Sequence, residues 1–355
     1  MVRGFEIAAG ELGTRGVRAV AIRRTGPPES LECGDMPLRE AGDGEVRIRV
    51  HRAGVNFADV LARQGIYPDA PKPPFVPGYE VSGVVESAGK GVDGLRAGDR
   101  VAAFTRFGGY AEFALADARF AVPLAPDIDF TTAAAVPVNF ATAYHCLFHT
   151  GPLFPGDRVL IHAAAGGVGL AAVQMAKGAG AELFGTAGSG EKIDFLRTFG
   201  VDHPIDYQRQ DFVEEVRKAT GGEGVDVILD SIGGSMIGRD LRVLRPGGRI
   251  VSLGLAAASG KSRPMMLREL MSAPRLQPIK LLESSRGFFG VNILRIFDHR
   301  PALGAVLLRA AFDLAKRGAA RPVIAAEIPL ERAGEAHRLL QSRTSIGKIV
   351  LTVRD

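Results

Sequence analysis

Residues 158–180 read RVLIHAAAGGVGLAAVQMAKGAG, and this stretch decides the fold. Its apolar opening predicts a buried strand, and LAAVQMAKGAG predicts a helix that begins directly after the turn AAGGVG at 164–169. Gly166, Gly167 and Gly169 carry no Cβ atom, so the chain can turn sharply there and a pyrophosphate can approach the backbone. The first N–H groups of the helix then present partial positive charge to an anion. The stretch therefore predicts a dinucleotide-binding turn.

The sequence after this turn alternates between strands and helices. Strand-like runs such as AELFGTAG, VDVILDSIG and GGRIVSLG are separated by helical stretches such as EKIDFLRTFG. That alternation predicts a parallel sheet covered on both faces, the doubly wound Rossmann arrangement of α/β proteins. A glycine-rich string alone is also compatible with a plain tight turn, and the first glycine of the usual fingerprint is Ala164 here. The order strand, turn, helix, strand is what favours the dinucleotide site.

The preceding part of the chain is rich in short strands. Runs such as VRAVAI, EVRIRVHRAGV and DRVAAF are bounded by Gly, Pro and Asp, which predicts a partly open β-barrel. From about Pro301 a helix, a strand, a second helix and a final strand follow, and we expect them to complete this barrel domain. We therefore predict a first domain at 1–130, a cofactor domain at 131–299 and a return to the first domain at 300–355.

The composition fits a two-domain globular protein and excludes several classes. The 355 residues are 46% hydrophobic and carry a formal charge of +5, but Arg and Lys are scattered, so no nucleic-acid-binding face is predicted. An anionic cofactor is a sufficient partner for this modest positive excess. Cys33 and Cys146 lie in neither a disulfide framework nor a metal-binding spacing. With no apolar leader and no apolar run of about 20 residues, the sequence predicts a soluble, cytoplasmic protein.

The end of the second strand of the cofactor domain indicates which nicotinamide cofactor binds. Enzymes that use NAD usually place Asp or Glu there to bind the ribose 2′-hydroxyl. The segment LFGTAGSGEK at 183–192 has no acidic residue until its ninth position, whereas Thr186 and Ser189 offer hydroxyl donors and Lys192 offers positive charge. Tyr207 follows where the next strand ends. These residues favour NADPH, although Lys192 taken alone is typical of a solvent-facing helix lysine.

Longer motifs carry a family resemblance that runs from about Val17 onward. They are GVNFADVLARQGIYP at 54–68, PFVPGYEVSGVV at 74–85, GGYAEF at 108–113, HAAAGGVGLAAVQMAK at 162–177, GVDHPIDY at 200–207, LRPGGRIVSLG at 244–254, GFFGVN at 287–292 and IGKIVL at 346–351. With these motifs the chain resembles the medium-chain dehydrogenase/reductase superfamily, in particular its quinone oxidoreductase branch and the vesicle amine transport protein 1 subgroup. The resemblance implies a GroES-like, partly open β-barrel catalytic domain joined to a Rossmann cofactor domain with a doubly wound parallel sheet.

The resemblance also implies chemistry without zinc. Members that are alcohol dehydrogenases hold a catalytic zinc with Cys and His at positions that match Asn56 and Tyr79, and neither of these side chains is a usual zinc ligand. Without a Lewis acid, hydride transfer suits quinones, enones and enoyl thioesters, in which negative charge spreads onto an oxygen. The isolated histidines are predicted to be structural: His51, His145, His149 and His162.

Individual residues receive candidate roles from the resemblance. Asn56 and Asp59 are expected where the substrate domain meets the nicotinamide, with a buried structural role for Asn56 as an equal alternative. Tyr67 matches a candidate proton donor of enoyl thioester reductases, since a phenol with a pKa near about 10 is protonated at neutral pH. Tyr-Pro is, however, also a good loop anchor. The implied cofactor contacts are Thr142 beside the nicotinamide, Ala165, Gly166, Gly167 and Val168 at the pyrophosphate, Thr186, Ser189, Lys192 and Tyr207 at the 2′-phosphate, and Leu255, Phe289 and Asn292 as nicotinamide walls.

Two functional classes remain open. The first is an NADPH-dependent reductase of quinones or α,β-unsaturated carbonyl compounds. The second is an NADPH-binding regulatory or membrane-associated protein of the vesicle amine transport protein 1 type, with little turnover. The methionine-rich residues 262–290 would then form a membrane patch, with a substrate-pocket cover or a dimer surface as the favoured alternatives. We expect a homodimer in which GFFGVNIL at 287–294 is the edge strand.

Overall fold

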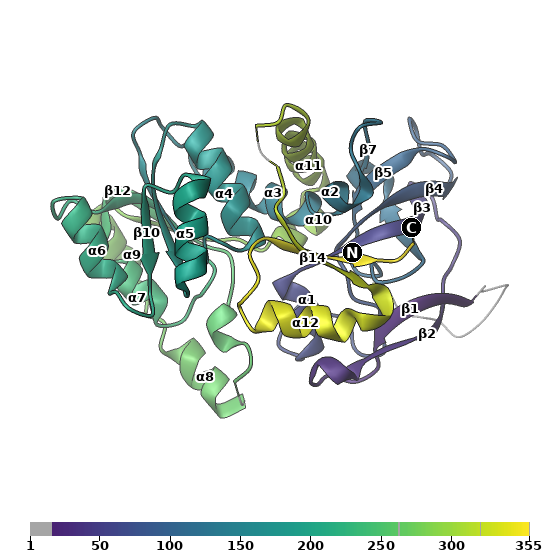
Figure 1. Cartoon of the computed structure of the whole chain (residues 1–355), viewed down its shortest axis with the longest axis horizontal. Coiled ribbons are helices and arrows are strands. Elements are labelled where there is room, and N and C mark those ends of the chain that lie inside the picture. Colours follow the sequence, from purple (N-terminus) through teal and green to yellow (C-terminus); the bar gives the residue numbers. More distant parts are fainter. Residues whose placement is uncertain (1–15, 262, 320, 355) are drawn as a thin grey trace. The chain divides into compact units, whose positions relative to one another are not determined.

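The computed structural model describes residues 16–261, 263–319 and 321–354, which pack into two compact units (Figure 1). Unit 1 contains the described residues up to 135, together with 326–343 and 349–354. Unit 2 contains the described residues of 136–325, together with 344–348. The predicted return to the first domain begins at 300, whereas residues up to 325 belong to unit 2. The difference arises because α11 (Pro301–Lys316) packs against α3 (Pro137–Tyr144) and α10 (Ile293–His299).

Unit 1 is built on a seven-stranded sheet with the order β14-β15-β3-β4-β5-β7, and β6 also pairs with β3. The long β3 pairs antiparallel with β4, β6 and β15, and its Val46, Ile48 and Val50 are buried on alternate positions, as expected for a strand with one face in the core. The strands are β3 (Glu45–Val55), β4 (Glu80–Ala88), β5 (Arg100–Phe104), β6 (Phe113–Asp117), β7 (Ala121–Pro123), β14 (Ile324–Pro329) and β15 (Lys348–Thr352), beside a separate antiparallel pair, β1 (Gly16–Ile22) and β2 (Leu31–Pro37).

Three α-helices accompany this sheet in the described part of unit 1. They are α1 (Phe57–Arg63), α2 (Phe130–Ala134) and α12 (Ala333–Gln341), and short 3-10 turns lie at Pro28–Ser30, Ala118–Phe120 and Leu330–Arg332. α12 packs against α1, so a helix from late in the sequence supports the helix that follows β3.

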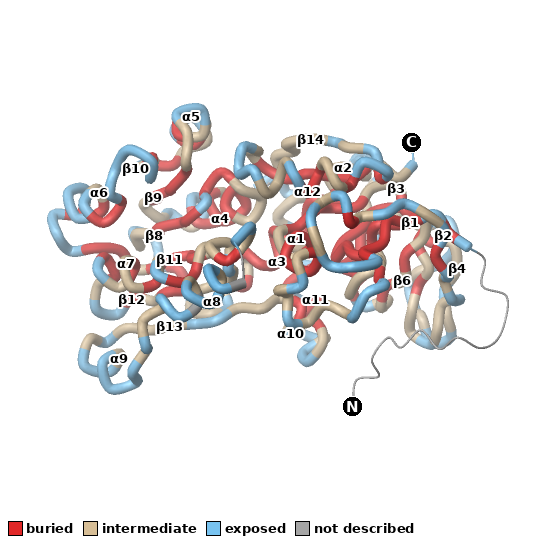
Figure 2. Tube along the Cα trace, turned by 90° about the horizontal axis from the view of Figure 1, so that it is seen from below, coloured by how far each residue is buried: buried red, intermediate tan, exposed pale blue. Residues whose placement is uncertain are grey.

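Unit 2 contains the predicted parallel sheet. Its six strands have the order β10-β9-β8-β11-β12-β13, and every neighbouring pair is parallel. β9 is buried at every position from Leu183 to Ala187, which is typical of a strand covered on both faces. Figure 2 shows β8 and β9 with long buried stretches, in contrast to the exposed α9. The strands are β8 (Arg158–Ile161), β9 (Glu182–Ala187), β10 (His203–Asp206), β11 (Val225–Asp230), β12 (Leu244–Ser252) and β13 (Gly287–Gly290).

The helices of unit 2 begin with α3, which starts at Pro137, a residue favoured in the first turn of a helix. A π-helical segment, His145–His149, continues α3. The other helices are α4 (Gly167–Gly178), α5 (Gly190–Phe199), α6 (Phe212–Ala219), α7 (Met236–Asp240), a 3-10 turn at Ala256–Ala258, α8 (Arg263–Met271), α9 (Pro278–Ser284), α10 and α11.

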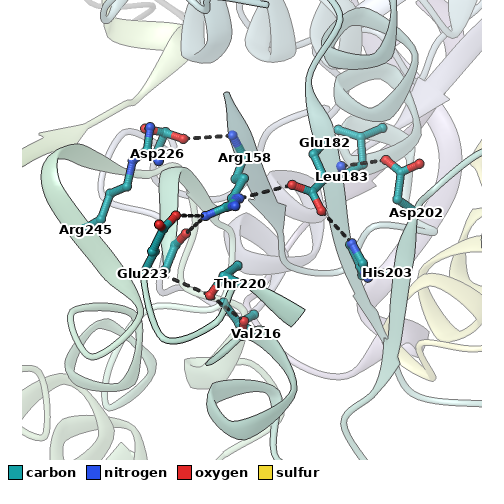
Figure 3. Close-up of polar contacts among 11 residues, drawn as sticks. Arg158, Glu182, Leu183, Asp202, His203, Val216, Thr220, Glu223, Asp226 and Arg245 are labelled. Atoms are coloured by element: carbon teal, nitrogen blue, oxygen red, sulfur yellow. Dashed lines mark hydrogen bonds and ion pairs between the residues drawn. The ribbon is translucent and has the colours of Figure 1, made fainter. Parts of the chain in front are cut away.

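A network of charged side chains joins the amino ends of neighbouring strands in unit 2 (Figure 3). Arg158, at the start of β8, lies 3.1 Å from Glu182 of β9 and 2.6 Å from Glu223. Glu182 also lies 2.8 Å from His203 of β10, and Asp226 of β11 accepts the backbone N–H of Arg158 at 2.8 Å. Because parallel strands all start at one edge, this network lies at the edge opposite the glycine-rich turn. We assign it to sheet stability rather than to chemistry.

Candidate functional site

The glycine-rich turn lies between β8 and α4, as predicted. β8 ends at Ile161, and α4 begins at Gly167 with Gly166 as its N-cap. A Cβ atom on Gly169 would lie 2.5 Å from the carbonyl oxygen of Ala163, so only glycine fits at that position. The N–H groups of the first helical turn have no carbonyl partner within the helix. The turn can therefore bind an anion such as a pyrophosphate.

Two residues distant in sequence support this turn. Gly347 donates its backbone N–H to the carbonyl of Ala165 at 2.9 Å and forms an isolated β-bridge with Gly166. Asn139 of α3 lies directly against α4, since a Cβ atom on Gly167 would be 2.2 Å from its Nδ2. No local pattern in the sequence marks either residue as a partner of the turn.

Three of the four predicted 2′-phosphate residues lie where β9 and β10 end side by side. Ser189 is the N-cap of α5, and its hydroxyl accepts the backbone N–H of Lys192 at 3.4 Å. Tyr207 packs on Gly188, where a Cβ atom would be 2.5 Å from the phenol oxygen. The half-buried Lys192 has a pKa lowered by burial. A hydroxyl, a cation and a phenol thus lie together at one end of the sheet.

Thr186 occupies a different position from these three. Its side chain is buried, and its hydroxyl oxygen lies 3.0 Å from Nδ1 of His162. His162 also approaches Asp240 of α7, with 2.8 Å between Nε2 and Oδ1. The sequence treated His162 as isolated, and the fold corrects this by giving it two buried polar partners. A contact between Thr186 and a 2′-phosphate stays a prediction.

The His162 cluster comprises His162, Thr186, Asp240 and Asp230, all buried. Burial alone would lower the pKa of His162, but the charge of Asp240 and its hydrogen bond outweigh that effect and the pKa is raised. Burial raises the pKa of Asp230, and the charge of Asp240 adds to that effect. The Asp230 carboxylate accepts the backbone N–H groups of Ile232 and Gly233 at 2.7 and 3.0 Å. The cluster therefore fixes the loop that follows β11.

The other predicted cofactor residues are spread over several elements of unit 2. Thr142 is buried in α3, whereas Leu255 after β12 and Phe289 in β13 are each 41% exposed. Asn292 is the N-cap of α10, and its side-chain oxygen accepts the N–H of Arg295 at 3.4 Å. Within the turn, Ala165 is buried and Val168 half-buried.

In unit 1 the predicted catalytic residues Asn56 and Asp59 form the start of α1. The Asp59 carboxylate accepts the backbone N–H groups of Asn56 and Gly78 at 2.8 and 2.9 Å. The amide Nδ2 of Asn56 donates to Glu80 of β4 at 2.8 Å. Both residues are buried, so this capping box is rigidly positioned.

The predicted catalytic Tyr67 is half-buried and belongs to an aromatic cluster in unit 1. Its ring centroid lies 6.0 Å from that of Tyr79 in an edge-to-face arrangement. Tyr79 lies 5.0 Å from Phe107, which in turn lies 5.6 Å from Phe75. Tyr79 immediately precedes Glu80, the partner of Asn56. The structure therefore brings Asn56, Asp59 and Tyr67 into one region of unit 1, together with Tyr79, to which the sequence assigned no role beyond the missing zinc ligand.

The methionine-rich stretch contains exposed apolar side chains on the described parts of α8 and α9. They are Met265, Leu267, Met271, Ile279 and Leu282. None of the described helices is long and apolar enough to cross a membrane. Within the described ranges, no group of three or more His, Cys, Asp or Glu side chains could hold a metal ion.

His337 of α12 is expected to make the stability of unit 1 depend on pH. It is buried beside Tyr110, whose hydroxyl lies 3.2 Å from Nε2, and burial lowers its pKa to about 3. A lowered pKa means that the stabilisation is present above the ordinary value of 6.5 and is lost as pH falls towards 3. We expect the free energy of unfolding to fall by about 1.4 kcal/mol per pH unit for this group.

Urea titrations of the wild type and of His337→Gln across that pH range test this expectation. The variant should be less stable at neutral pH but should show the shallower dependence on pH. Equal slopes for the two proteins would mean that His337 does not titrate with unfolding.

Known proteins share both units of this chain. Residues 42–127 match the alcohol dehydrogenase GroES-like domain family and residues 167–280 match the zinc-binding dehydrogenase family. The zebrafish (Danio rerio) synaptic vesicle membrane protein VAT-1 homolog is 39% identical over 313 residues, which cover 87% of this chain and 64% of that protein. The rat (Rattus norvegicus) quinone oxidoreductase is 32% identical over 342 residues, which cover 96% of this chain and 98% of that protein.

Solved structures give the same result. The human synaptic vesicle membrane protein VAT-1 homolog-like protein has a TM-score of 0.83 and 33% identity, with coverage of 96% of this chain and 99% of that one. The Escherichia coli quinone oxidoreductase complexed with NADPH has a TM-score of 0.84 and 30% identity, with coverage of 95% and 100%. A GroES-like β-unit and a Rossmann unit together define a class of nicotinamide-dependent oxidoreductases, as predicted. The chain belongs to the medium-chain dehydrogenase/reductase superfamily, and its likeness is to the quinone oxidoreductases and VAT-1 homologs.

Proposed function

We propose that this chain is an NADPH-dependent oxidoreductase that reduces quinones or α,β-unsaturated carbonyl compounds without zinc. The observation that carries the proposal is the grouping of Ser189, Lys192 and Tyr207 near the end of β9, a segment with no acidic residue before Glu191 to bind a ribose 2′-hydroxyl. The similarity to a quinone oxidoreductase complexed with NADPH supports the same cofactor.

The residues of unit 2 suit that cofactor. NADPH, when bound, supplies a hydride. The backbone at Ala165, Gly166, Gly167 and Val168 would hold its pyrophosphate through the first turn of α4. Thr142, Leu255, Phe289 and Asn292 are proposed to line the nicotinamide. Thr186 would support the ribose pocket indirectly, because its hydroxyl oxygen already lies within hydrogen-bond distance of Nδ1 of His162.

The residues of unit 1 would orient the acceptor. Asn56 and Asp59 are held by buried hydrogen bonds, so they can fix the position of a substrate with little loss of side-chain freedom. We assign Tyr67 as a candidate donor for the proton that completes the reduction. A conjugated acceptor suits this arrangement because its negative charge develops on an oxygen that hydrogen bonds can stabilise.

Cofactor choice is tested by Lys192→Ala. Losing a charged hydrogen-bond donor should weaken NADPH binding about 10- to 100-fold and leave NADH binding nearly unchanged. The matched control is Lys218→Ala, which removes an exposed lysine from the last turn of α6. Isothermal titration with both cofactors measures the effect. A parallel loss of NADPH and NADH affinity in Lys192→Ala would contradict the assignment.

The activity itself is tested by following NADPH absorbance after addition of a quinone and then of an enone. Oxidation of NADPH with either acceptor supports the reductase. Tight NADPH binding without turnover would favour the second candidate, an NADPH-binding protein of the VAT-1 type. The exposed apolar side chains of α8 and α9 favour that second reading, and sedimentation with lipid vesicles distinguishes it.

We also propose a homodimer. β13 is the last strand of the six-stranded sheet, and Phe289 on it is exposed, so an unpaired strand edge is available for a second copy. Analytical ultracentrifugation that detects only monomer would exclude this assembly.

A further inference from the structure

The hydroxyl of Tyr79 is a buried donor without a partner among the described residues. The residue is only 3% exposed, and its backbone is fixed because its carbonyl accepts the N–H of Thr105 at 2.7 Å. A buried polar group that makes no hydrogen bond destabilises a folded protein, so such groups are rare and call for an explanation. Because no described residue satisfies this donor, a bound molecule can do so.

The surroundings of Tyr79 indicate the chemistry of that molecule. Its ring contacts those of Tyr67 and Phe107, with centroids 6.0 and 5.0 Å away. Both neighbouring residues are half-buried, so part of this aromatic cluster reaches the outside of unit 1. A flat, conjugated molecule can stack against such rings, which a charged or strongly hydrated ligand would do poorly.

The hydroxyl also keeps its proton over the whole working range of pH. Burial raises the pKa of Tyr79 well above its usual value of 10, and the charge of Asp59 adds to this effect. The group is therefore a hydrogen-bond donor, and it is a poor source of a transferable proton. Proton supply is assigned separately, to the half-buried Tyr67.

We propose that Tyr79 donates its O–H hydrogen bond to the carbonyl oxygen of a quinone or conjugated carbonyl substrate that binds against the aromatic rings of Tyr67 and Phe107. This inference rests on the proposed function. NADPH, when bound, would supply the hydride that reduces the acceptor, and the carbonyl oxygen would gain the negative charge. Tyr79 stabilises that oxygen and retains its proton, and the proton that completes the product comes from water, directly or through Tyr67.

The variant Tyr79→Phe removes only the oxygen, and the inference requires two effects of opposite sign. The free protein should become more stable, with a melting temperature raised by about 2 °C, because an unsatisfied buried group is gone. The kcat/KM for a quinone acceptor such as 1,4-naphthoquinone should fall about 100-fold, with the dissociation constant for NADPH unchanged. A hydroxyl with a purely structural hydrogen bond would instead give a lower melting temperature, which would overturn the inference.

The control is Tyr144→Phe, which removes a phenol from a half-buried tyrosine of α3 and should change neither quantity. Direct binding of 1,4-naphthoquinone, followed by ligand-observed NMR, separates this inference from the proposed function. If the wild type binds the quinone but oxidises no NADPH, the reductase fails, and weaker quinone binding by Tyr79→Phe still supports the donor. Equal binding by both proteins, or no binding by the wild type, rejects the role of Tyr79.

Discussion

The variant Gly169→Ala is expected to abolish tight NADPH binding and to destabilise unit 2. The added methyl group would lie 2.5 Å from the carbonyl oxygen of Ala163 and 2.6 Å from that of Ala164, and backbone atoms cannot move away as a flexible side chain can. Overpacking of this kind costs about 3 kcal/mol, and the displaced turn would no longer aim its N–H groups at the pyrophosphate. We expect the dissociation constant for NADPH to rise at least about 100-fold.

A second glycine of the same helix provides the matched control. Nothing lies within 4 Å of a Cβ atom built on Gly178, so Gly178→Ala should bind NADPH normally and be equally or slightly more stable. Calorimetric titration and urea unfolding of the two variants measure both effects. Normal NADPH affinity in Gly169→Ala would show that the cofactor does not use this turn.

The second large effect is expected from Asp240→Asn in the His162 cluster. His162 and Asp240 are both buried in the wild type. Removing the charge of Asp240 leaves the buried His162 without a compensating charge and should lower the free energy of unfolding by about 3–5 kcal/mol. The pKa of His162 is raised above 6.5, so the stabilisation is fully present below 6.5 and is lost as pH rises through the higher folded value. The difference between wild type and variant should therefore be larger at mildly acidic than at alkaline pH.

Two other charges face the same imidazole, since Asp230 raises its pKa and Arg239 lowers it. The control is Asp194→Asn, which breaks an exposed ion pair with Arg197 on α5 and should change stability by less than about 0.5 kcal/mol. Urea unfolding across the pH range measures both variants. A pH-independent difference for Asp240→Asn would mean that His162 is neutral in the folded protein.

The features that the sequence predicted well are those with a local cause. The strand, turn and helix around Gly166 follow from apolar runs and from glycines that a tight turn requires. The strands of the barrel unit follow from alternating apolar residues, as in β3.

The features that the sequence missed depend on partners distant in the chain. His162 and Asp240 are 78 residues apart, and Tyr110 and His337 are 227 residues apart, so no local pattern connects them. The predicted domain boundary near 300 differs from the observed one at 325 for a similar reason. The amphipathic pattern of α11 predicts that one face of the helix is buried, but it does not tell which helix covers that face. The sequence marks Tyr79 only as a residue that replaces a zinc ligand, since an unsatisfied hydroxyl can be recognised only in three dimensions.

The pairing of β3 with β15 has a consequence for biosynthesis. Gly54 pairs with Val350, a separation of 350 − 54 = 296 residues. At a translation rate of about 5–20 residues per second, about 15–60 s pass between the synthesis of β3 and the synthesis of β15. During that time the part of the β3 edge that β15 covers in the folded protein can pair with other chains. The carbonyl of Ala165 likewise has no hydrogen bond from Gly347 until that residue has been synthesised. Slowly translated or prematurely terminated copies are therefore expected to aggregate more readily than complete ones.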